Sequence, residues 1–284
     1  MKEPEHISEG NTFDKVLRSL GFGEQVDRRE RGECPLCGKK IEKTEFRDQL
    51  SFKEFTEFTK EENLEEYMKF GGFPEIVLEK SEEKKTTILQ QYFEDIIHKD
   101  IIDRYNIRNT KLIIDLARYL VSASGSKLSI NKLSKTFGTA KDTLRTYINY
   151  MIDAYLLFEV TYFSYSTKVK HDISKLPKIY CLDNGITAIA NIKYTKNTGQ
   201  MFENTIFIKL AEEHKEISYW GENEYEVDFI IEKTAINVTS TDKIPEREFK
   251  GLEEFNKKHK GFNTIIIAPT LKKENITPIK EFIK

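Results

Sequence analysis

The chain has 284 residues, with 45 lysines and arginines against 47 aspartates and glutamates, and a formal net charge of −2. This length predicts two or three small domains, and the nearly balanced charge means that any contact with nucleic acid must be local. No apolar run reaches the ~20 residues that cross a bilayer, and the charged N-terminus is not that of a signal peptide. Three cysteines provide no disulfide framework. We therefore expect a cytoplasmic protein without a membrane partner.

Residues 1–60 are expected to be a poorly ordered N-terminal region that carries the sequence CPLCG. Cys34 and Cys37 have the spacing of a zinc knuckle, but four ligands are needed and no second pair follows. A degenerate half of a zinc ribbon, a zinc site completed by a second chain and a redox-active pair are three interpretations. We favour the first, because no thioredoxin-like context surrounds the pair.

Residues 61–125 read as a helical connector. LEEYMKF is expected to end at Gly71 and Gly72, Pro74 breaks the pattern, and the amphipathic run ILQQYFEDIIHKDII follows. TKLIIDLARYLVSASG then predicts a further helix that ends at Gly125.

Residues 126–182 are expected to form a winged helix. SINKLSKTFG predicts a short helix with Ser129 as its N-cap, a face made of Ile130, Leu133 and Phe137, and Gly138 at its end. A second helix is expected to begin with Thr139 as N-cap and Asp142 three residues later. FEVTYFSY and PKIYCLD follow as two strands around a lysine-containing loop. Helix, turn, helix and hairpin together predict the winged-helix arrangement.

The second helix carries the candidate contacts with duplex DNA. Leu144, Ile148, Met151 and Tyr155 are expected to form its buried stripe, which leaves Lys141, Arg145 and Asn149 outside. Candidate DNA contacts are Thr139, Lys141, Thr143 and Arg145 on the helix, with Lys168, Lys170, His171 and Lys175 in the wing. Two alternatives stay open, since these lysines suit an ordinary solvated face and the same architecture also serves protein interaction.

Residues 183–284 contain a helix, GQMFENTIFIKLAEEH, then the strands ISYW, EVDFIIE and AINVTST, and a second helix that starts at EREFKGLEEF. This order, with Glu203, Asp228 and the triplet Asn237-Val238-Thr239, resembles the αβββαβ core of the restriction-endonuclease-like PD-(D/E)XK fold. In that core the triplet reads Glu or Gln, any residue, Lys. The last carboxylate and the lysine are therefore missing here.

A hairpin that turns through Glu232 and Lys233 would place Asp228 opposite Asn237. Asn237 and Thr239 would share one face of the strand, with Val238 pointing into the core. Phosphodiester cleavage needs carboxylates that hold a divalent cation and a positive group, so nuclease activity is not expected. Two alternatives remain: Glu203 and Asp228 hold one Mg²⁺ weakly, with Glu246 or Glu248 as a further ligand, or the latter two acids are simply helix-start charges.

Seven ordered landmarks carry a wider resemblance: GGFPEIV (71–77), HKDIIDRYNI (98–107), the winged-helix run, LPKIYCLDNGI (176–186), GQMFEN (199–204), YEVDFII (225–231) and EREFKGL (246–252). They resemble the C-terminal half of archaeal and bacterial AAA-like P-loop ATPases of unknown function, whose tail is a winged helix plus a nuclease-like domain. LSFKEF (50–55) resembles the segment that ends the ATPase domain of that family.

The N-terminal part departs from that family. No GxxxxGK[ST] occurs in the chain, and CPLCGKKIEKTEFRDQLS is similar to half of a small archaeal zinc-ribbon-like protein. The resemblance implies a truncated or recombined gene without the motor, and a nuclease-like fold that is not catalytic, because family members often carry Thr at the lysine position.

The sequence therefore predicts an α+β multidomain protein with boundaries at 1–60, 61–125, 126–182 and 183–284. Its expected role is that of a non-catalytic module that binds DNA or a protein partner. A weak Mg²⁺-dependent nuclease and a regulatory or assembly partner of a separate intact ATPase are the alternatives. ATP hydrolysis is not expected.

Overall fold

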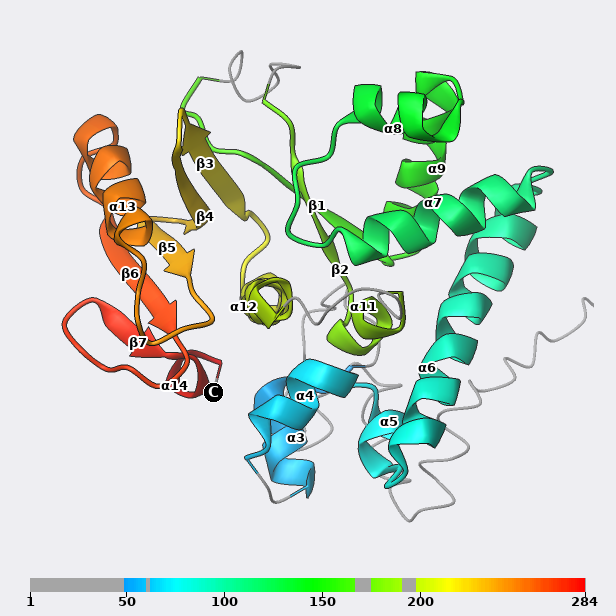
Figure 1. The fold of residues 1–284 in the computed structure, drawn as a ribbon, viewed down its shortest axis with the longest axis horizontal. Helices are drawn as coiled ribbons and strands as arrows, with labels where there is room; N and C mark the ends of the chain where they lie inside the picture. The colour runs from blue at the N-terminus through cyan, green and yellow to red at the C-terminus, as the bar shows by residue number, and fades with distance from the viewer. Residues whose placement is uncertain (1–48, 60–61, 167–174, 191–197, 284) are drawn as a thin grey trace, which may run out of the picture. The chain divides into compact units, whose positions relative to one another are not determined.

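A mixed seven-stranded sheet organises the part of the protein that the computed structural model describes, which is residues 49–59, 62–166, 175–190 and 198–283. The strands lie in the order β2-β1-β3-β4-β5-β6-β7 (Figure 1). Their bounds are β1 Leu157–Tyr162, β2 Lys178–Cys181, β3 Ser218–Glu222, β4 Tyr225–Ile231, β5 Thr234–Val238, β6 Asn263–Ala268 and β7 Ile276–Pro278. The predicted N-terminal region is outside the described residues up to position 48, and so are Cys34 and Cys37.

The strand pairing joins two regions that the sequence predicts as separate domains. β1 pairs antiparallel with β2 and parallel with β3, while β3, β4 and β5 form an antiparallel meander. β5, β6 and β7 then pair in parallel. The expected boundary between residues 182 and 183 thus falls inside one continuous sheet, because Thr161 and Tyr162 of β1 lie beside Ser218 and Tyr219 of β3.

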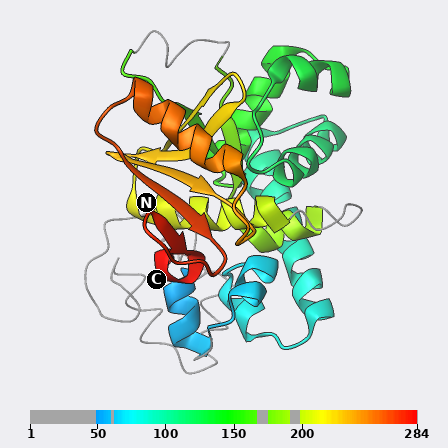
Figure 2. The same cartoon turned by 60° about the vertical axis from the view of Figure 1, so that its left-hand side comes forward.

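Helices precede, interrupt and cover this sheet. They are α3 Phe52–Thr59, α4 Leu64–Phe70, α5 Pro74–Leu78, α6 Glu82–Asp95, the π-helix η1 Ile96–Asp103, α7 Thr110–Ser122, α8 Ile130–Phe137, α9 Lys141–Asp153, α11 Asn184–Ala190, α12 Thr198–Glu213, α13 Glu246–Lys258 and α14 Ile279–Phe282. α13 packs on β4, β5 and β6, and α12 on β2 and β5. The sheet lies between these two helices (Figures 1 and 2). None of the helices in the described ranges is long and apolar enough to cross a membrane.

The stop and start signals of the predicted helical connector are confirmed. α4 ends before Gly71, whose φ of +77° suits glycine, and Pro74 is the first residue of α5. The amphipathic run does not stay α-helical, since residues 96–103 widen into the π-helix η1.

Two of the sequence landmarks lock together around Asp183. Its carboxylate accepts hydrogen bonds from the backbone N–H of Gly72 at 2.9 Å and of Ile186 at 3.1 Å. A Cβ on Gly71 would lie 2.0 Å from this carboxylate, so only glycine fits there. Burial raises the pKa of Asp183 to about 6, although its backbone hydrogen bonds oppose the shift. This contact ties the connector to the start of α11.

A buried polar network ties α11 and α12 to β2. The Asn204 side chain donates to Oδ1 of Asn184 at 2.9 Å, and its own Oδ1 accepts from the Ser124 hydroxyl at 2.7 Å and from the Cys181 N–H at 3.1 Å. Asn184 donates in turn to the Thr205 hydroxyl at 2.6 Å. Because each buried polar atom in this chain of contacts has a partner, the network fixes the relative position of the three elements.

The predicted helix signals in α8 are confirmed, whereas one in α9 is wrong. Ser129 caps α8 and Gly138 ends it in the left-handed conformation, although only Leu133 of the predicted face is fully buried. α9 has Ala140 as its N-cap, because the Thr139 hydroxyl donates instead to the carbonyl of Phe137 at 3.1 Å.

The stripe of α9 is as predicted for Leu144, Ile148 and Met151, which are buried. Tyr155 does not belong to it, since α9 ends at Asp153 and Tyr155 has a φ of +55°.

Candidate functional site

Glu203 and Asp228, the two acids that the sequence singled out, meet around the ammonium group of Lys178. α12 carries Glu203, β4 carries Asp228, and Lys178 is the first residue of β2. Lys178 Nζ lies 3.1 Å from Glu203 Oε1 and 3.1 Å from Asp228 Oδ1. The Lys178 side chain is only 3% exposed. A buried ammonium therefore occupies the space between the two predicted acids.

A third carboxylate and a phenol complete this acid cluster, which we define as Lys178, Glu203, Glu226, Asp228 and Tyr180. Glu226 Oε1 lies 2.7 Å from Lys178 Nζ, and the Tyr180 hydroxyl donates to Glu203 Oε1 at 2.6 Å. Outside the cluster, Lys127 pairs with the other oxygen of Glu226 at 2.6 Å. Within the described ranges, no three histidine, cysteine or acidic side chains are placed to hold a metal ion.

The acid cluster shifts the pKa values of its members in different directions. Burial alone would lower the pKa of Lys178, but the negative charges around it outweigh burial and hold that pKa well above its usual value. Burial and then the charge of Asp228 raise the pKa of Glu203 to about 7. The pKa of Glu226 falls, despite burial, because of Lys178 and Lys127. Lys178 thus stays charged and compensates the acids.

The predicted hairpin is confirmed, and it places Asn237 beside Asp228. Phe229 pairs with Ile236, and the same register brings Asp228 opposite Asn237. The backbone N–H of Asp228 donates to Asn237 Oδ1 at 3.1 Å, and the N–H of Val238 donates to Asp228 Oδ2 at 2.9 Å. Asp228 is therefore held by backbone donors as well as by Lys178.

The expected facing of the triplet is wrong for Val238, whereas the burial of both Asn237 and Thr239 agrees with the expectation that they share a face. Asn237 is 1% and Thr239 6% exposed, whereas Val238 is only half-buried. The reason is that β5 lies inside the sheet with α13 packed on it, so both of its sides are covered. The Asn237 amide donates to the carbonyls of Glu248, at 2.9 Å, and Glu226, at 3.3 Å. Asn237 thus joins β5 to α13 and β4.

The two acids at the start of α13 differ. Glu246 is exposed and pairs with Lys250. The Glu248 side chain is 12% exposed and accepts a hydrogen bond from Arg247 Nε at 2.9 Å. Burial and the charge of Asp228 raise the pKa of Glu248, which places it in the electrostatic field of the acid cluster.

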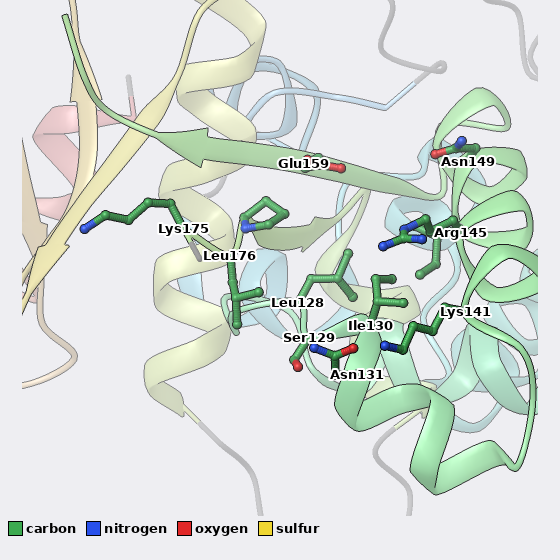
Figure 3. A pocket seen from close by; sticks show the side chains of 12 residues that line it. Leu128, Ser129, Ile130, Asn131, Lys141, Arg145, Asn149, Glu159, Lys175 and Leu176 are labelled. Carbon is green, nitrogen blue, oxygen red and sulfur yellow. The ribbon is translucent and has the colours of Figure 1, made fainter. Parts of the chain in front are cut away.

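A pocket of about 480 Å³ lies beside the exposed face of α9 (Figure 3). Lys141 and Arg145 of α9 bring two cations to it, and Glu159 of β1 brings one carboxylate. Lys175, ahead of β2, also lines the pocket, but its side chain points away from Lys141 and Arg145 (Figure 3), and its ammonium lies 4.2 Å from the centroid of the Tyr162 ring. The amides of Asn131 and Asn149 and the apolar side chains of Leu128, Ile130, Ile148, Leu176 and Pro177 also line it, together with Ser129. We call this set of residues the α9 pocket.

The structure brings together some of the predicted DNA contacts and not others. Lys141, Arg145 and Lys175 share the α9 pocket, and the predicted exposure of Lys141, Arg145 and Asn149 is confirmed. Thr139 and Thr143 are half-buried and do not line the pocket. Lys168, Lys170 and His171 of the predicted wing lie outside the described residues.

Sequence reasoning missed Lys178, Tyr180 and Glu226. One signal was available: Lys178 starts the apolar run KIYC, where each residue of the strand is buried. A lysine in a buried strand requires a counter-charge, and one unassigned acid, Glu226, was present in YEVDFII.

The comparisons with known proteins place this architecture among uncharacterised relatives. Residues 61–196 match a family described as a domain of unknown function (DUF8612). An uncharacterised protein of Methanocaldococcus jannaschii is 35% identical over 207 residues, which are 67% of this chain and 45% of that protein. An uncharacterised protein of Haemophilus influenzae is 27% identical over 197 residues, 65% of this chain and 48% of that protein.

The chain thus spans about half the length of the curated relatives it matches. No solved structure matches it. The matched family segment includes Lys178 and the α9 pocket but ends before Glu203 and Asp228.

Proposed function

We propose that this protein is a non-catalytic nucleic-acid-binding module in which a winged helix supplies the contact surface. The α9 pocket carries this proposal. It places Lys141 and Arg145 of α9 in one concavity with the side-chain amides of Asn131 and Asn149, where they can meet the phosphates of a nucleic acid.

The order of elements supports the winged-helix assignment. α7 is followed by a short bridge between Lys127 and Lys178, then by α8, α9, β1 and β2. This isolated bridge joins the segment between α7 and α8 to β2, which pairs antiparallel with β1. In a winged helix the helix at the position of α9 lies on the surface, where the side chains of that helix can reach a ligand.

The exposed face of α9 has cations with few competing partners. Within the described ranges, Lys141 forms no ion pair, and Arg145 pairs only with Asp142, at 3.0 Å on the exposed surface. A pair of that kind contributes about 0–1 kcal/mol, so a phosphate group displaces it readily. Both cations are therefore available to phosphate oxygens.

The order α12, β3, β4, β5, α13, β6 supports a nuclease-like core without catalysis. Lys178 neutralises Glu203 and Asp228, and the amide of Asn237 is used between backbone carbonyls. These groups stabilise the fold, so the core serves as a scaffold for the winged helix.

Binding of labelled duplex and single-stranded DNA, followed by fluorescence anisotropy at rising salt, tests the proposal. We expect affinity that falls steeply with salt, and a loss of about tenfold or more in the Lys141→Ala/Arg145→Ala double variant. Lys215→Ala, an exposed lysine outside the pocket, is the matched control. The absence of binding at low salt, or equal affinity of both variants, would refute the proposal.

A metal-dependent nuclease is the second candidate, and one observation favours it. Lys178 Nζ, 3.1 Å from both Glu203 and Asp228, supplies the positive group that the triplet lacks. Plasmid cleavage in Mg²⁺ or Mn²⁺ that Asp228→Ala abolishes would support this candidate. No cleavage, or cleavage that survives Asp228→Ala, would eliminate it. The role as a partner of a separate ATPase stays a prediction, which co-purification from the native cell tests.

A further inference from the structure

The α9 pocket contains more than a phosphate site needs. Its floor is apolar, with Leu128, Ile130, Ile148, Leu176 and Pro177, and its rim is polar. A volume of about 480 Å³ lies within the range of roughly 300–1,000 Å³ that small-molecule sites occupy. A nucleic-acid backbone that crosses a surface needs cations but has no use for an apolar cavity of this size.

Three polar groups around the rim have no partner inside the described part of the protein. Glu159 forms no ion pair or hydrogen bond there, and neither do the side-chain amides of Asn131 and Asn149. Figure 3 shows Glu159 on the β1 side of the pocket and Lys141, Arg145 and Asn149 on the α9 side. The pocket thus offers one free acceptor and two free amides in addition to its cations.

Glu159 discriminates between possible occupants. A phosphate oxygen near this carboxylate would be repelled, whereas an N–H group on a ligand would be stabilised by it. The occupant must therefore combine a negative charge for Lys141 and Arg145, an apolar surface for the floor and an N–H donor for Glu159. Neighbouring atoms partly desolvate this carboxylate and raise the pKa of Glu159, although the residue stays exposed to solvent.

We infer that the α9 pocket holds one unpaired nucleotide of a single nucleic-acid strand, with the base on the apolar floor, its amino group on Glu159 and its phosphates on Lys141 and Arg145. This inference rests on the proposed nucleic-acid binding and specifies the form of the ligand. In a duplex each base is stacked between its neighbours, so the face of a paired base cannot lie on the apolar floor while its amino group meets Glu159. Single strands expose both the edge and the face of the base.

The test compares short labelled oligomers of deoxycytidine, thymidine and abasic deoxyribose phosphate, each bound to the full chain. Cytosine carries an exocyclic amino group, whereas the single N–H of thymine lies between two carbonyl oxygens that a carboxylate repels. We expect deoxycytidine oligomers to bind about tenfold more tightly than thymidine oligomers. Abasic strands should bind most weakly, and a fully paired duplex should bind less tightly than the deoxycytidine strand.

Glu159→Gln removes the charge with little change of shape and should bring the cytidine-to-thymidine ratio close to one. Glu253→Gln, an exposed glutamate on α13, is the matched control and should keep the wild-type ratio. The Lys141→Ala/Arg145→Ala double variant should weaken all strands together, abasic ones included.

The outcomes separate this inference from the function on which it rests. Equal binding of cytidine, thymidine, abasic and duplex ligands, all weakened by the double variant, would overturn the nucleotide assignment while leaving nucleic-acid binding intact. Absence of binding by every nucleic acid would overturn both. Binding of a polyglutamate peptide as tight as that of deoxycytidine, and unaffected by Glu159→Gln, would overturn the nucleotide assignment in favour of an acidic protein segment.

Discussion

Replacing Lys178 by methionine tests whether its ammonium holds the acid cluster together. Methionine keeps an unbranched side chain of similar volume, so the substitution removes the charge with little loss of packing. It leaves Glu203, Glu226 and Asp228, whose oxygens lie 2.7–3.1 Å from Lys178 Nζ, without their shared cation.

Removal of one partner from a buried ion pair costs about 3–5 kcal/mol. The acids here keep 15–37% of their side-chain exposure, and water therefore screens part of the repulsion. We expect the free energy of unfolding to fall by about 3 kcal/mol, at the lower end of that range, which corresponds to a melting temperature lower by about 6–12 °C.

The cost should also depend on pH. Because the pKa of Glu203 is raised to about 7 from 4.5, the folded state binds more protons than the unfolded state between those values. Stability from this group is therefore present below the unfolded pKa and is lost as pH rises through the folded pKa. Without the ammonium that pKa rises further, so the penalty of Lys178→Met should be larger at about pH 8 than at about pH 5.

Urea unfolding followed by the fluorescence of Trp220, the single tryptophan of the chain, provides the measurement. Lys127→Met is the matched control, since Lys127 pairs with the same Glu226 but is 43% exposed. We expect the control to lose no more than about 1 kcal/mol. A Lys178→Met variant as stable as the control, or a penalty that does not change with pH, would refute the reasoning.

Three further substitutions probe the polar contacts of the core. Asn237→Asp removes the amide that donates to two carbonyls and adds a carboxylate beside Asp228. The free energy of unfolding in urea near neutral pH should therefore fall by about 2–4 kcal/mol; unchanged stability would contradict the structural role of the amide. Gly71→Ala, at φ +77° and with its Cβ 2.0 Å from Asp183, should cost about 1–3 kcal/mol in the same assay, and a neutral effect would contradict that close contact. Asp183→Asn leaves one of two N–H groups without a good acceptor, at a cost of about 1–3 kcal/mol. Because the pKa of Asp183 is raised from 3.8 to about 6, the stability that this group gives the wild type is lost as pH rises from 3.8 to about 6. Urea unfolding across this pH range should show that the free energy of unfolding of the Asn variant lacks this decrease. The same decrease in both proteins would count against the raised pKa of Asp183.

Local signals made much of the fold predictable. Gly71, Pro74, Ser129 and Gly138 act through the backbone conformation of one or two residues, so their effects can be read from the sequence. The Asp228–Asn237 pairing was also accessible, because a tight turn fixes the register of a hairpin.

Long-range contacts were not accessible in the same way. In the sequence, Lys178 lies 25 residues from Glu203 and 50 from Asp228. No residue close to Lys178 in the sequence specifies that β2 packs against α12. The same holds for the junction of β1 and β3, which joins two regions predicted as separate domains. Both contacts depend on how the whole sheet is assembled.

The shape of the α9 pocket was likewise beyond the sequence. Helical spacing places Lys141, Arg145 and Asn149 on one exposed face, as predicted. That this face looks onto Glu159 and the segment before β2 depends on how α9 packs against β1. The exposed face of α9 thereby becomes one wall of a concavity.

The salt dependence of binding to a deoxycytidine oligomer tests the central claim most directly. For single strands, the logarithm of the association constant changes with the logarithm of salt concentration with a slope of about −0.7 per phosphate contact. If Lys141 and Arg145 each neutralise one phosphate, their double alanine variant should bind more weakly and its slope should be shallower by about 1.4. A slope identical to that of the wild type would contradict the assignment of the α9 pocket as the nucleic-acid site.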